Sequence, residues 1–216
     1  MDARLKKIIA GLEESYKDYF EPFVTKVGKE NYPYKVLIST LISLRTKDAV
    51  TAIAAEKLFL LADSPQKMIK LSAEQIKKAI YPAGFYKRKA QTIIDASKTL
   101  IEKYDGQVPD DLDKLLEIKG VGRKTANLVV SEGFNMPGLC VDTHVHRISN
   151  RLGLVKTKNA FGTEIALKGL LPLEYWKPFN MWLVAHGQNT CNPVSPKCSL
   201  CKISGECMKV SVIKSR

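Results

Sequence analysis

Leu115-Leu116-Glu117-Ile118-Lys119-Gly120-Val121-Gly122-Arg123-Lys124-Thr125-Ala126 joins two helical segments through a Gly-x-Gly turn. Glycine lets a backbone approach a ligand closely, and the first N–H groups of the helix that follows have no acceptor within that helix. Those donors and the positive end of the helix dipole together favour an anion. Gly-x-Gly turns are common, so the turn is a weak signal until its neighbours are considered.

Three basic side chains, Lys119, Arg123 and Lys124, strengthen this signal. The start of a helix disfavours cations, so the stability of the helix does not explain them. A bound phosphate would explain them, and so would a lysine that acts as an amine nucleophile. Such a lysine must be neutral, and neighbouring cations and burial lower its pKa from the ~10.4 of model peptides. A solvated basic helix start remains the alternative.

A second polar cluster follows eighteen residues after Lys124, in Val141-Asp142-Thr143-His144-Val145-His146-Arg147. Asp142 precedes a predicted helix and is either its N-cap or a functional carboxylate. A metal site that combines Asp142 with His144 and His146 is disfavoured, because side chains two residues apart on a helix point away from each other.

Four of the five cysteines, Cys191, Cys198, Cys201 and Cys207, fall within seventeen residues as C-x6-C-x2-C-x5-C. Four thiolates can hold one [4Fe–4S] cluster, whereas a zinc ribbon would show two C-x2-C pairs. Clustered thiols without a signal peptide indicate a reducing compartment, which disfavours disulfides. The pattern therefore predicts a [4Fe–4S] cluster, with zinc and disulfides as weaker alternatives.

Net charge points to a polyanionic partner. The 216-residue chain has 34 lysines and arginines against 22 aspartates and glutamates, a formal charge of +12, and Lys87, Arg88 and Lys89 are adjacent. No basic amphipathic anchor appears, so nucleic acid is favoured over a membrane surface. No signal peptide or membrane-length apolar run is apparent, and we expect a cytoplasmic protein with no membrane partner.

The apolar pattern predicts an all-α fold. One apolar stripe at helical spacing runs from Leu5 to Phe20 and another from Ala90 to Tyr104. Ser72 and Gln75 predict a capping box that opens a helix ending near Ile80. Further helices are expected near residues 34–44, 49–61, 109–117, 124–134, 143–151, 159–170 and 174–187. No sustained alternation of apolar and polar residues suggests a sheet.

The hairpin at 118–126, the turn at 141–144 and the cysteine pattern occur together in this order. In this combination the chain, from Pro33 to Cys207, resembles endonuclease III, a family of helix-hairpin-helix DNA glycosylases. The resemblance implies two helical domains flanking a DNA-binding cleft. Residues 24–136 would form a six-helix barrel domain, and residues 1–23 with 137–216 a second domain that the [4Fe–4S] cluster closes.

The same resemblance implies the chemistry and the partner. Lys124 would attack the sugar C1′ of a flipped nucleotide and form a Schiff base, and Asp142 would stabilise positive charge on the sugar and assist proton movement. The enzyme would excise oxidised pyrimidines and nick the strand 3′ to the abasic site by β-elimination. The partner would be double-stranded DNA with a damaged base or abasic site, bound by a nucleoid-associated, prokaryotic-type monomer.

Three positions depart from the family pattern at the DNA surface. Arg45, within Ser43-Leu44-Arg45-Thr46-Lys47-Asp48, stands where the family places a glutamine that fills the hole in the stack. Phe85 stands at a second wedge position that is usually aliphatic. Lys119 replaces the common hairpin proline and is expected to add a phosphate contact. The other expected DNA contacts are Lys87, Gly120, Val121, Gly122, Arg123, Thr125, His144 and Lys197.

Three other functions are weighed against this one. An adenine-DNA glycosylase is disfavoured by the presence of Lys124 and by the absence of any Glu between Tyr32 and Ala55. A mismatch thymine or uracil glycosylase stays open because of Arg45, although its members usually replace the lysine. A non-enzymatic, redox-sensing DNA-binding protein would need the hairpin and the cluster but not Lys124 together with Asp142.

Overall fold

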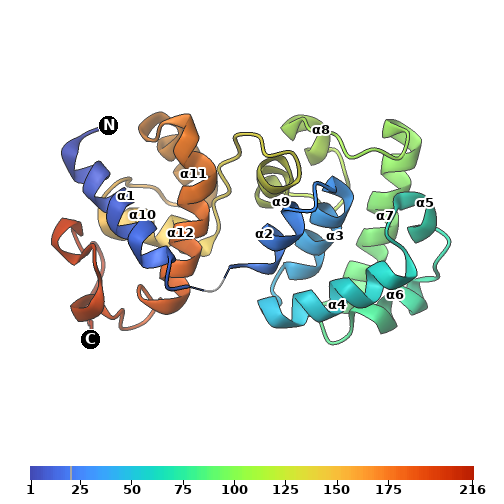
Figure 1. Cartoon of the computed structure of the whole chain (residues 1–216), viewed down its shortest axis with the longest axis horizontal. Coiled ribbons are helices and arrows are strands. Elements are labelled where there is room, and N and C mark those ends of the chain that lie inside the picture. Colours follow the sequence, from blue (N-terminus) through green and yellow to red (C-terminus); the bar gives the residue numbers. More distant parts are fainter. Residues whose placement is uncertain (20) are drawn as a thin grey trace. The chain divides into compact units, whose positions relative to one another are not determined.

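Every regular element of residues 1–19 and 21–216, the part of the chain that this computed structural model describes, is helical, and no strand occurs there (Figure 1). The predicted all-α class is confirmed. Phe20, which the sequence places on the first apolar stripe, lies outside the described residues. None of the helices in the described residues is long and apolar enough to cross a membrane.

The chain folds as two compact units. One, here called the terminal unit, combines Met1–Glu21 with Pro137–Arg216, and the other, the central unit, is Pro22–Met136. The corresponding domains expected from the sequence were 1–23 with 137–216, and 24–136. Lys124 belongs to the central unit, whereas Asp142 and the four clustered cysteines belong to the terminal unit.

The central unit is built around α3 (Pro33–Ser43), which contacts α2, α4, α7, α9 and η1. Proline at the first position of α3 fits a helix start, since its missing N–H would have no partner there. The other elements of this unit are α2 (Phe23–Gly28), α4 (Asp48–Leu61), α5 (Pro65–Met68), α6 (Ala73–Ile80), α7 (Tyr86–Tyr104), α8 (Leu112–Leu116), α9 (Arg123–Leu128) and the π-helical turn η1 (Val129–Gly133).

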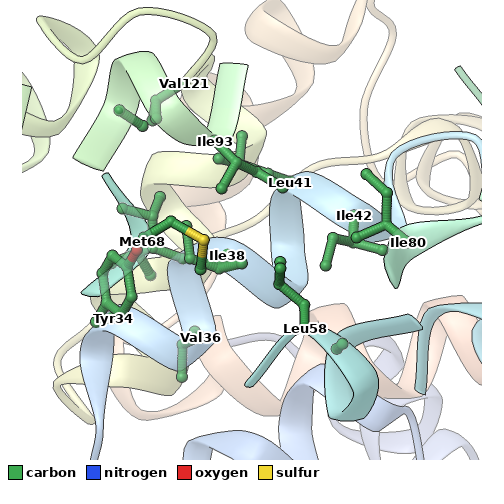
Figure 2. Close-up of a cluster of buried hydrophobic side chains, with 14 of the residues drawn as sticks. Tyr34, Val36, Ile38, Leu41, Ile42, Leu58, Met68, Ile80, Ile93 and Val121 are labelled. Carbon is green, nitrogen blue, oxygen red and sulfur yellow. The ribbon is translucent and has the colours of Figure 1, made fainter. Parts of the chain in front are cut away.

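Side chains from nearly every face of α3 enter the central core (Figure 2). Residues 36–42 are all buried, and the Tyr34 hydroxyl lies 2.8 Å from the Ser97 Oγ of α7. Burial raises the pKa of Tyr34 well above its usual range, so the phenol stays neutral and can donate to Ser97. Val121 of the Gly-x-Gly turn belongs to the same core, which ties the turn to α3 and its neighbours.

The terminal unit packs α1 (Ala3–Tyr16) against α12 (Trp176–Asn189). Its other elements are α10 (Thr143–Leu152), α11 (Ala160–Leu170) and the 3-10 turns η2 (Leu173–Tyr175), η3 (Cys198–Leu200) and η4 (Ser204–Glu206). A Cβ on Gly11 of α1 would lie 2.5 Å from the side chain of Ile203, so α1 closely covers the segment between Cys201 and Cys207.

The helices of the structure confirm some of the predicted boundaries and differ from others. The capping box of Ser72 and Gln75 is confirmed at the start of α6. The helix expected over 109–117 is shortened to α8, because the Asp111 side chain accepts from the N–H groups of Asp113 and Lys114 and so begins the helix later. The helix expected over 124–134 is α-helical only to Leu128 and continues as η1. The short helices α2 and α5 were not predicted.

Replacing Leu41, which is 1% exposed, tests the central role of α3. We expect Leu41→Ala to lower the free energy of unfolding by about 2–5 kcal/mol, because it removes buried methyl groups and leaves a cavity. Urea denaturation followed by circular dichroism measures the change. Leu60→Ala on α4 is the control, since Leu60 is 87% exposed and its loss should cost less than about 0.5 kcal/mol. Equal losses of unfolding free energy in the two variants would contradict the central role of α3 in the core.

Candidate functional site

The Gly-x-Gly turn between α8 and α9 is fixed against α7 on one side and open on the other. Gly120 has φ +90°, and a Cβ there would lie 2.3 Å from Cγ2 of Thr92 on α7. Only glycine therefore fits both the backbone conformation and the space. Gly122, the N-cap of α9, makes no side-chain cap bond and has open space where its Cβ would be. The turn thus presents backbone at an accessible helix start.

The four remaining hairpin residues predicted to contact DNA, and the predicted nucleophile Lys124, divide by burial. The side chains of Val121 and Thr125 are buried, so these two residues offer only backbone to a ligand. Lys124 is exposed, and Arg123 is half-buried. Lys119 is exposed, with 79% of its side-chain surface accessible.

Lys119 has a partner within the fold. Its Nζ lies 2.9 Å from Oδ2 of Asp95 on α7, which also accepts a 2.7 Å bond at Oδ1 from Gln91. Lys119 and Gln91 lower the pKa of the Asp95 carboxyl. Lys119 thus has a partner on α7 that the sequence did not predict, although an exposed pair contributes only about 0–1 kcal/mol.

Asp142 is the N-cap of α10. Its Oδ1 accepts hydrogen bonds from the backbone N–H groups of His144, at 2.8 Å, and Val145, at 2.9 Å. These bonds fix the carboxylate against the helix start, where the dipole also favours its negative charge. The structural role that the sequence left open is thus present, and the half-buried carboxylate keeps a fixed orientation.

The two histidines after Asp142 face different partners. His144 Nδ1 lies 3.1 Å from Nη2 of Arg147, and a Cβ on Gly187 of α12 would lie 2.3 Å from the same ring nitrogen. His146 Nδ1 instead lies 2.6 Å from the Thr163 Oγ1 of α11. The backbone of α12 therefore comes close to His144, which fixes the ring beside the start of α10.

Arg45 and Phe85 form an exposed pair from two different loops of the central unit. The Arg45 guanidinium carbon lies 5.6 Å from the centroid of the Phe85 ring, within the range of a cation–π contact. Phe85 is 61% exposed, and both residues have left-handed backbones, with φ +53° at Arg45 and +58° at Phe85. The structure brings together two of the three positions at which this chain departs from the family pattern. Lys87, two residues after Phe85, is exposed.

Lys89 is a residue that the sequence analysis misjudged. It stands in the basic run 87–89, yet it is only 7% exposed. Its Nζ donates to the carbonyls of Ile42 and Leu44, both at 2.6 Å, and to Thr46 Oγ1 at 2.8 Å. Burial lowers the pKa of Lys89 to about 8. Its spacing from buried Ile93 put it on the apolar face of α7, and that was the signal available in the sequence.

The four clustered cysteines are half-buried and line one pocket in the terminal unit, and none forms a disulfide. Nitrogen atoms approach three of the sulfurs. Nη1 of Arg151 lies 3.4 Å from Cys191 Sγ, the backbone N–H of Lys209 donates to Cys207 Sγ at 3.4 Å, and His186 Nε2 lies 3.7 Å from Cys201 Sγ. Arg151 is itself buried and held by the carbonyls of Asn192 and Pro193, each at 2.6 Å.

Burial raises the pKa of the Cys201 thiol to about 11 and also raises the pKa of Cys207, and the neighbouring thiols add to both effects. Thiolates at these two positions would therefore be stabilised by added positive charge, as bound iron or zinc provides. No three or more His, Cys, Asp or Glu side chains of the described residues are arranged to hold a metal ion. The donor set fits a thiolate-bound centre in its chemistry. Lys197, a predicted DNA contact, is half-buried on the wall of this pocket.

The cap at α10 gives a stability prediction. We expect Asp142→Ala to lower the free energy of unfolding by about 0.5–2 kcal/mol, because two N–H groups lose their acceptor. Asp142→Asn keeps an acceptor and should cost less. Denaturant titration measures both, and Asn159→Ala, which removes the N-cap of α11, is the matched control with a loss of similar size. An unchanged stability in Asp142→Ala would show that the cap contributes nothing.

Comparison with known proteins places these features in context. The model of the HhH-GPD superfamily of base excision DNA repair proteins matches residues 38–172. Endonuclease III of Thermotoga maritima is 49% identical over 179 residues, which cover 83% of this chain and 84% of that protein. Endonuclease III of Escherichia coli K12 is 37% identical over 175 residues, covering 81% and 83%.

Solved structures agree with the sequence comparisons. A trapped endonuclease III–DNA covalent intermediate, an estranged-adenine complex, matches with a TM-score of 0.81 at 31% identity and covers 97% of both chains. A thermostable thymine-DNA glycosylase matches with a TM-score of 0.84 at 24% identity, covering 96% of this chain and 98% of that one, which shows a shared fold alone.

Proposed function

The chain belongs to the endonuclease III family within the HhH-GPD superfamily, and we propose that Lys124 is the nucleophile and Asp142 the assisting carboxylate of its reaction. The protein is a base excision repair enzyme, a DNA glycosylase and abasic-site lyase. Membership of this family of enzymes rules out the hypothesis of a non-enzymatic, redox-sensing DNA-binding protein. The observation that supports the residue assignment is an exposed lysine at the accessible start of α9, next to a turn that only glycine can form.

The proposed reaction begins when the damaged nucleotide leaves the base stack. The neutral amine of Lys124 forms a bond to the sugar C1′ while the bond from C1′ to the base breaks, and the base departs with the electron pair and takes up a proton. The sugar ring then opens to a protonated Schiff base. Loss of a 2′ proton expels the 3′ phosphate by β-elimination, and water releases Lys124 from the product.

Asp142 is suited to stabilise the positive charge that develops on the sugar, and to move protons to and from the reacting groups. Its two bonds to the start of α10 hold the carboxylate in one orientation, so little of the reaction free energy is spent on reorganising it. A carboxylate fixed in this way can act electrostatically without becoming a second nucleophile.

Several of the predicted contacts would bind DNA at its backbone. We propose that Gly120 and Gly122 present N–H groups to phosphates, and that Lys119, Arg123 and Lys87 add charge, in keeping with the net charge of +12. Lys119 can change partner at little cost, because its bond to Asp95 is largely solvated. Arg45 and Phe85 would enter the gap left by the flipped nucleotide, Phe85 by stacking and Arg45 by hydrogen bonds to the opposite base.

The remaining proposals concern the lesion and the setting. We propose oxidised pyrimidines as the bases removed, and a monomer acting on double-stranded DNA of the nucleoid in the cytoplasm of a prokaryotic-type cell. A mismatch thymine or uracil glycosylase remains the alternative because of Arg45. That class does not need a lysine nucleophile, so the experiment on Lys124 separates the two.

Borohydride trapping on duplex DNA with one abasic site tests the assignment of Lys124. We expect the wild type to form a reduced covalent adduct and Lys124→Ala to form none, because borohydride captures only the Schiff base. Lys98→Ala, which removes an exposed lysine of α7, is the control and should still be trapped. An adduct of undiminished yield in Lys124→Ala would assign the nucleophile to another amine, and no adduct in the wild type would favour a monofunctional glycosylase.

We further propose that Cys191, Cys198, Cys201 and Cys207 hold a [4Fe–4S] cluster, a group capable of one-electron chemistry that would here cross-link the C-terminal loop. The half-buried thiols, the guanidinium of Arg151 and the N–H of Lys209 support this, since hydrogen bonds to sulfur stabilise thiolate ligands. With the loop fixed, Lys197 would contact a phosphate.

Cluster binding gives a prediction with a matched control. We expect Cys198→Ser to lose most of its iron and acid-labile sulfide, because a serine hydroxyl is a poor ligand for iron in such a cluster. Cys140→Ala should keep both, because Cys140 is buried away from the pocket that the other four line. Elemental analysis and visible absorption of anaerobically purified protein provide the measurement. Stoichiometric zinc in the wild type would overturn the cluster assignment.

A further inference from the structure

The loop between α3 and α4 holds Arg45 in an unfavourable backbone conformation. A non-glycine residue in the left-handed region has a strained contact between its Cβ and the backbone, and it persists only where surrounding contacts hold it. Phe85, at the start of α7, has the same kind of backbone. The contacts that hold these two loops together therefore decide how Arg45 and Phe85 are presented to solvent.

Several contacts join the two loops, and they involve buried or close-packed atoms. The Lys89 ammonium donates hydrogen bonds to the carbonyls of Ile42 and Leu44 at the end of α3. These donors replace the helical N–H partners that the two carbonyls lack. Its third hydrogen bond goes to Thr46 Oγ1. The carbonyl of Arg45 itself lies 2.4 Å from the place where a Cβ on Gly84 would be, so the two backbones touch.

Thr46 extends the connection from Lys89 to the second loop. Its Oγ1 accepts a 3.1 Å hydrogen bond from the N–H of Gly84, the residue immediately before Phe85. Lys89 itself follows Phe85 by one helical turn, and its N–H donates to the Phe85 carbonyl. A single buried ammonium is thus connected to the residues on both sides of Arg45 and, through Thr46, to the residue before Phe85.

We infer that Lys89 is a positioning residue for the proposed DNA-intercalating pair: its buried ammonium holds the 43–47 and 83–86 loops together so that Arg45 and Phe85 enter the stack in one preset geometry. The inference rests on the proposed function. Without the ammonium, the carbonyls of Ile42 and Leu44 lose their donors and the loop that carries Arg45 can relax out of the left-handed conformation. The rate of reactions that require opening of the duplex would fall, whereas the rate of reaction at a sugar that is already exposed would not.

The test compares duplex with single-stranded substrates. Lys89→Met keeps the approximate volume and removes the donors; Lys98→Met, an exposed lysine on the same helix, is the matched control. Single-turnover release of 5-hydroxyuracil from a duplex should fall about 10-fold or more in Lys89→Met, because small misplacements of positioned groups slow reactions strongly. Borohydride trapping on a single strand with one abasic site should stay within about 2-fold of the wild type. Lys98→Met should change neither.

A milder variant keeps the inference testable if Lys89→Met does not fold, which circular dichroism would reveal. Thr46→Val removes only the hydroxyl that links Lys89 to Gly84, and it should lower the duplex rate in the same selective way by a smaller factor. A fluorescent 2-aminopurine beside the lesion should report less unstacking in both variants than in the wild type.

Defined outcomes would overturn the inference. If Lys89→Met is folded and its duplex rate is unchanged, Lys89 has a structural role only. The same conclusion follows if its duplex and single-strand reactions fall together. If Lys89→Met is unfolded, Thr46→Val decides: an unchanged ratio of the duplex rate to the single-strand rate assigns Lys89 a structural role only. Failure of the proposed function gives a different result: the wild type itself would trap no abasic DNA.

Discussion

Burial of α3 on nearly all of its faces is the constraint on which the central unit depends. A helix with apolar residues all round has to be covered by other helices, and α2, α4, α7, α9 and η1 supply that cover. The Gly-x-Gly turn is fixed by the same core, because Ile118 and Val121 are buried on either side of Gly120. The exposed start of α9, with Lys124, is therefore carried by a rigid support rather than by a mobile loop.

Burial of nearly all of α3 leaves the last carbonyls of the helix without access to water. The last carbonyls of a helix have no partner within the helix, and buried carbonyls without donors cost about 1–3 kcal/mol each. The Lys89 ammonium supplies the missing donors: its three N–H groups bond to the carbonyls of Ile42 and Leu44 and to Thr46 Oγ1. The same need explains why a lysine is retained in an apolar face of α7, where an aliphatic residue would pack without the cost of burying a charge.

The sequence predicted most of the helices and the hairpin, because these depend on local signals: apolar periodicity, a capping box and glycines in a turn. It also offered both roles of Asp142, of which the structure shows the cap. What it missed depends on contacts between distant residues. Asp95 pairs with Lys119 across 24 positions, and Lys89 reaches Ile42 across 47. The spacing of Lys89 from Ile93 indicated the apolar face of α7, but no local pattern identified its distant acceptors or the partner of Lys119.

The left-handed backbones of Arg45 and Phe85 connect the fold with its use. Each costs roughly 1–2 kcal/mol that glycine at the same position would avoid. Glycine would also remove the side chain, and these are the two exposed side chains that meet by a cation–π contact. Proteins tend to break a local rule where function requires it and to compensate elsewhere. Here the compensation is visible in the close approach of Gly84 to the Arg45 carbonyl and in the hydrogen bonds of Lys89. The strain is thus kept in place by the same buried contacts that hold the two loops together.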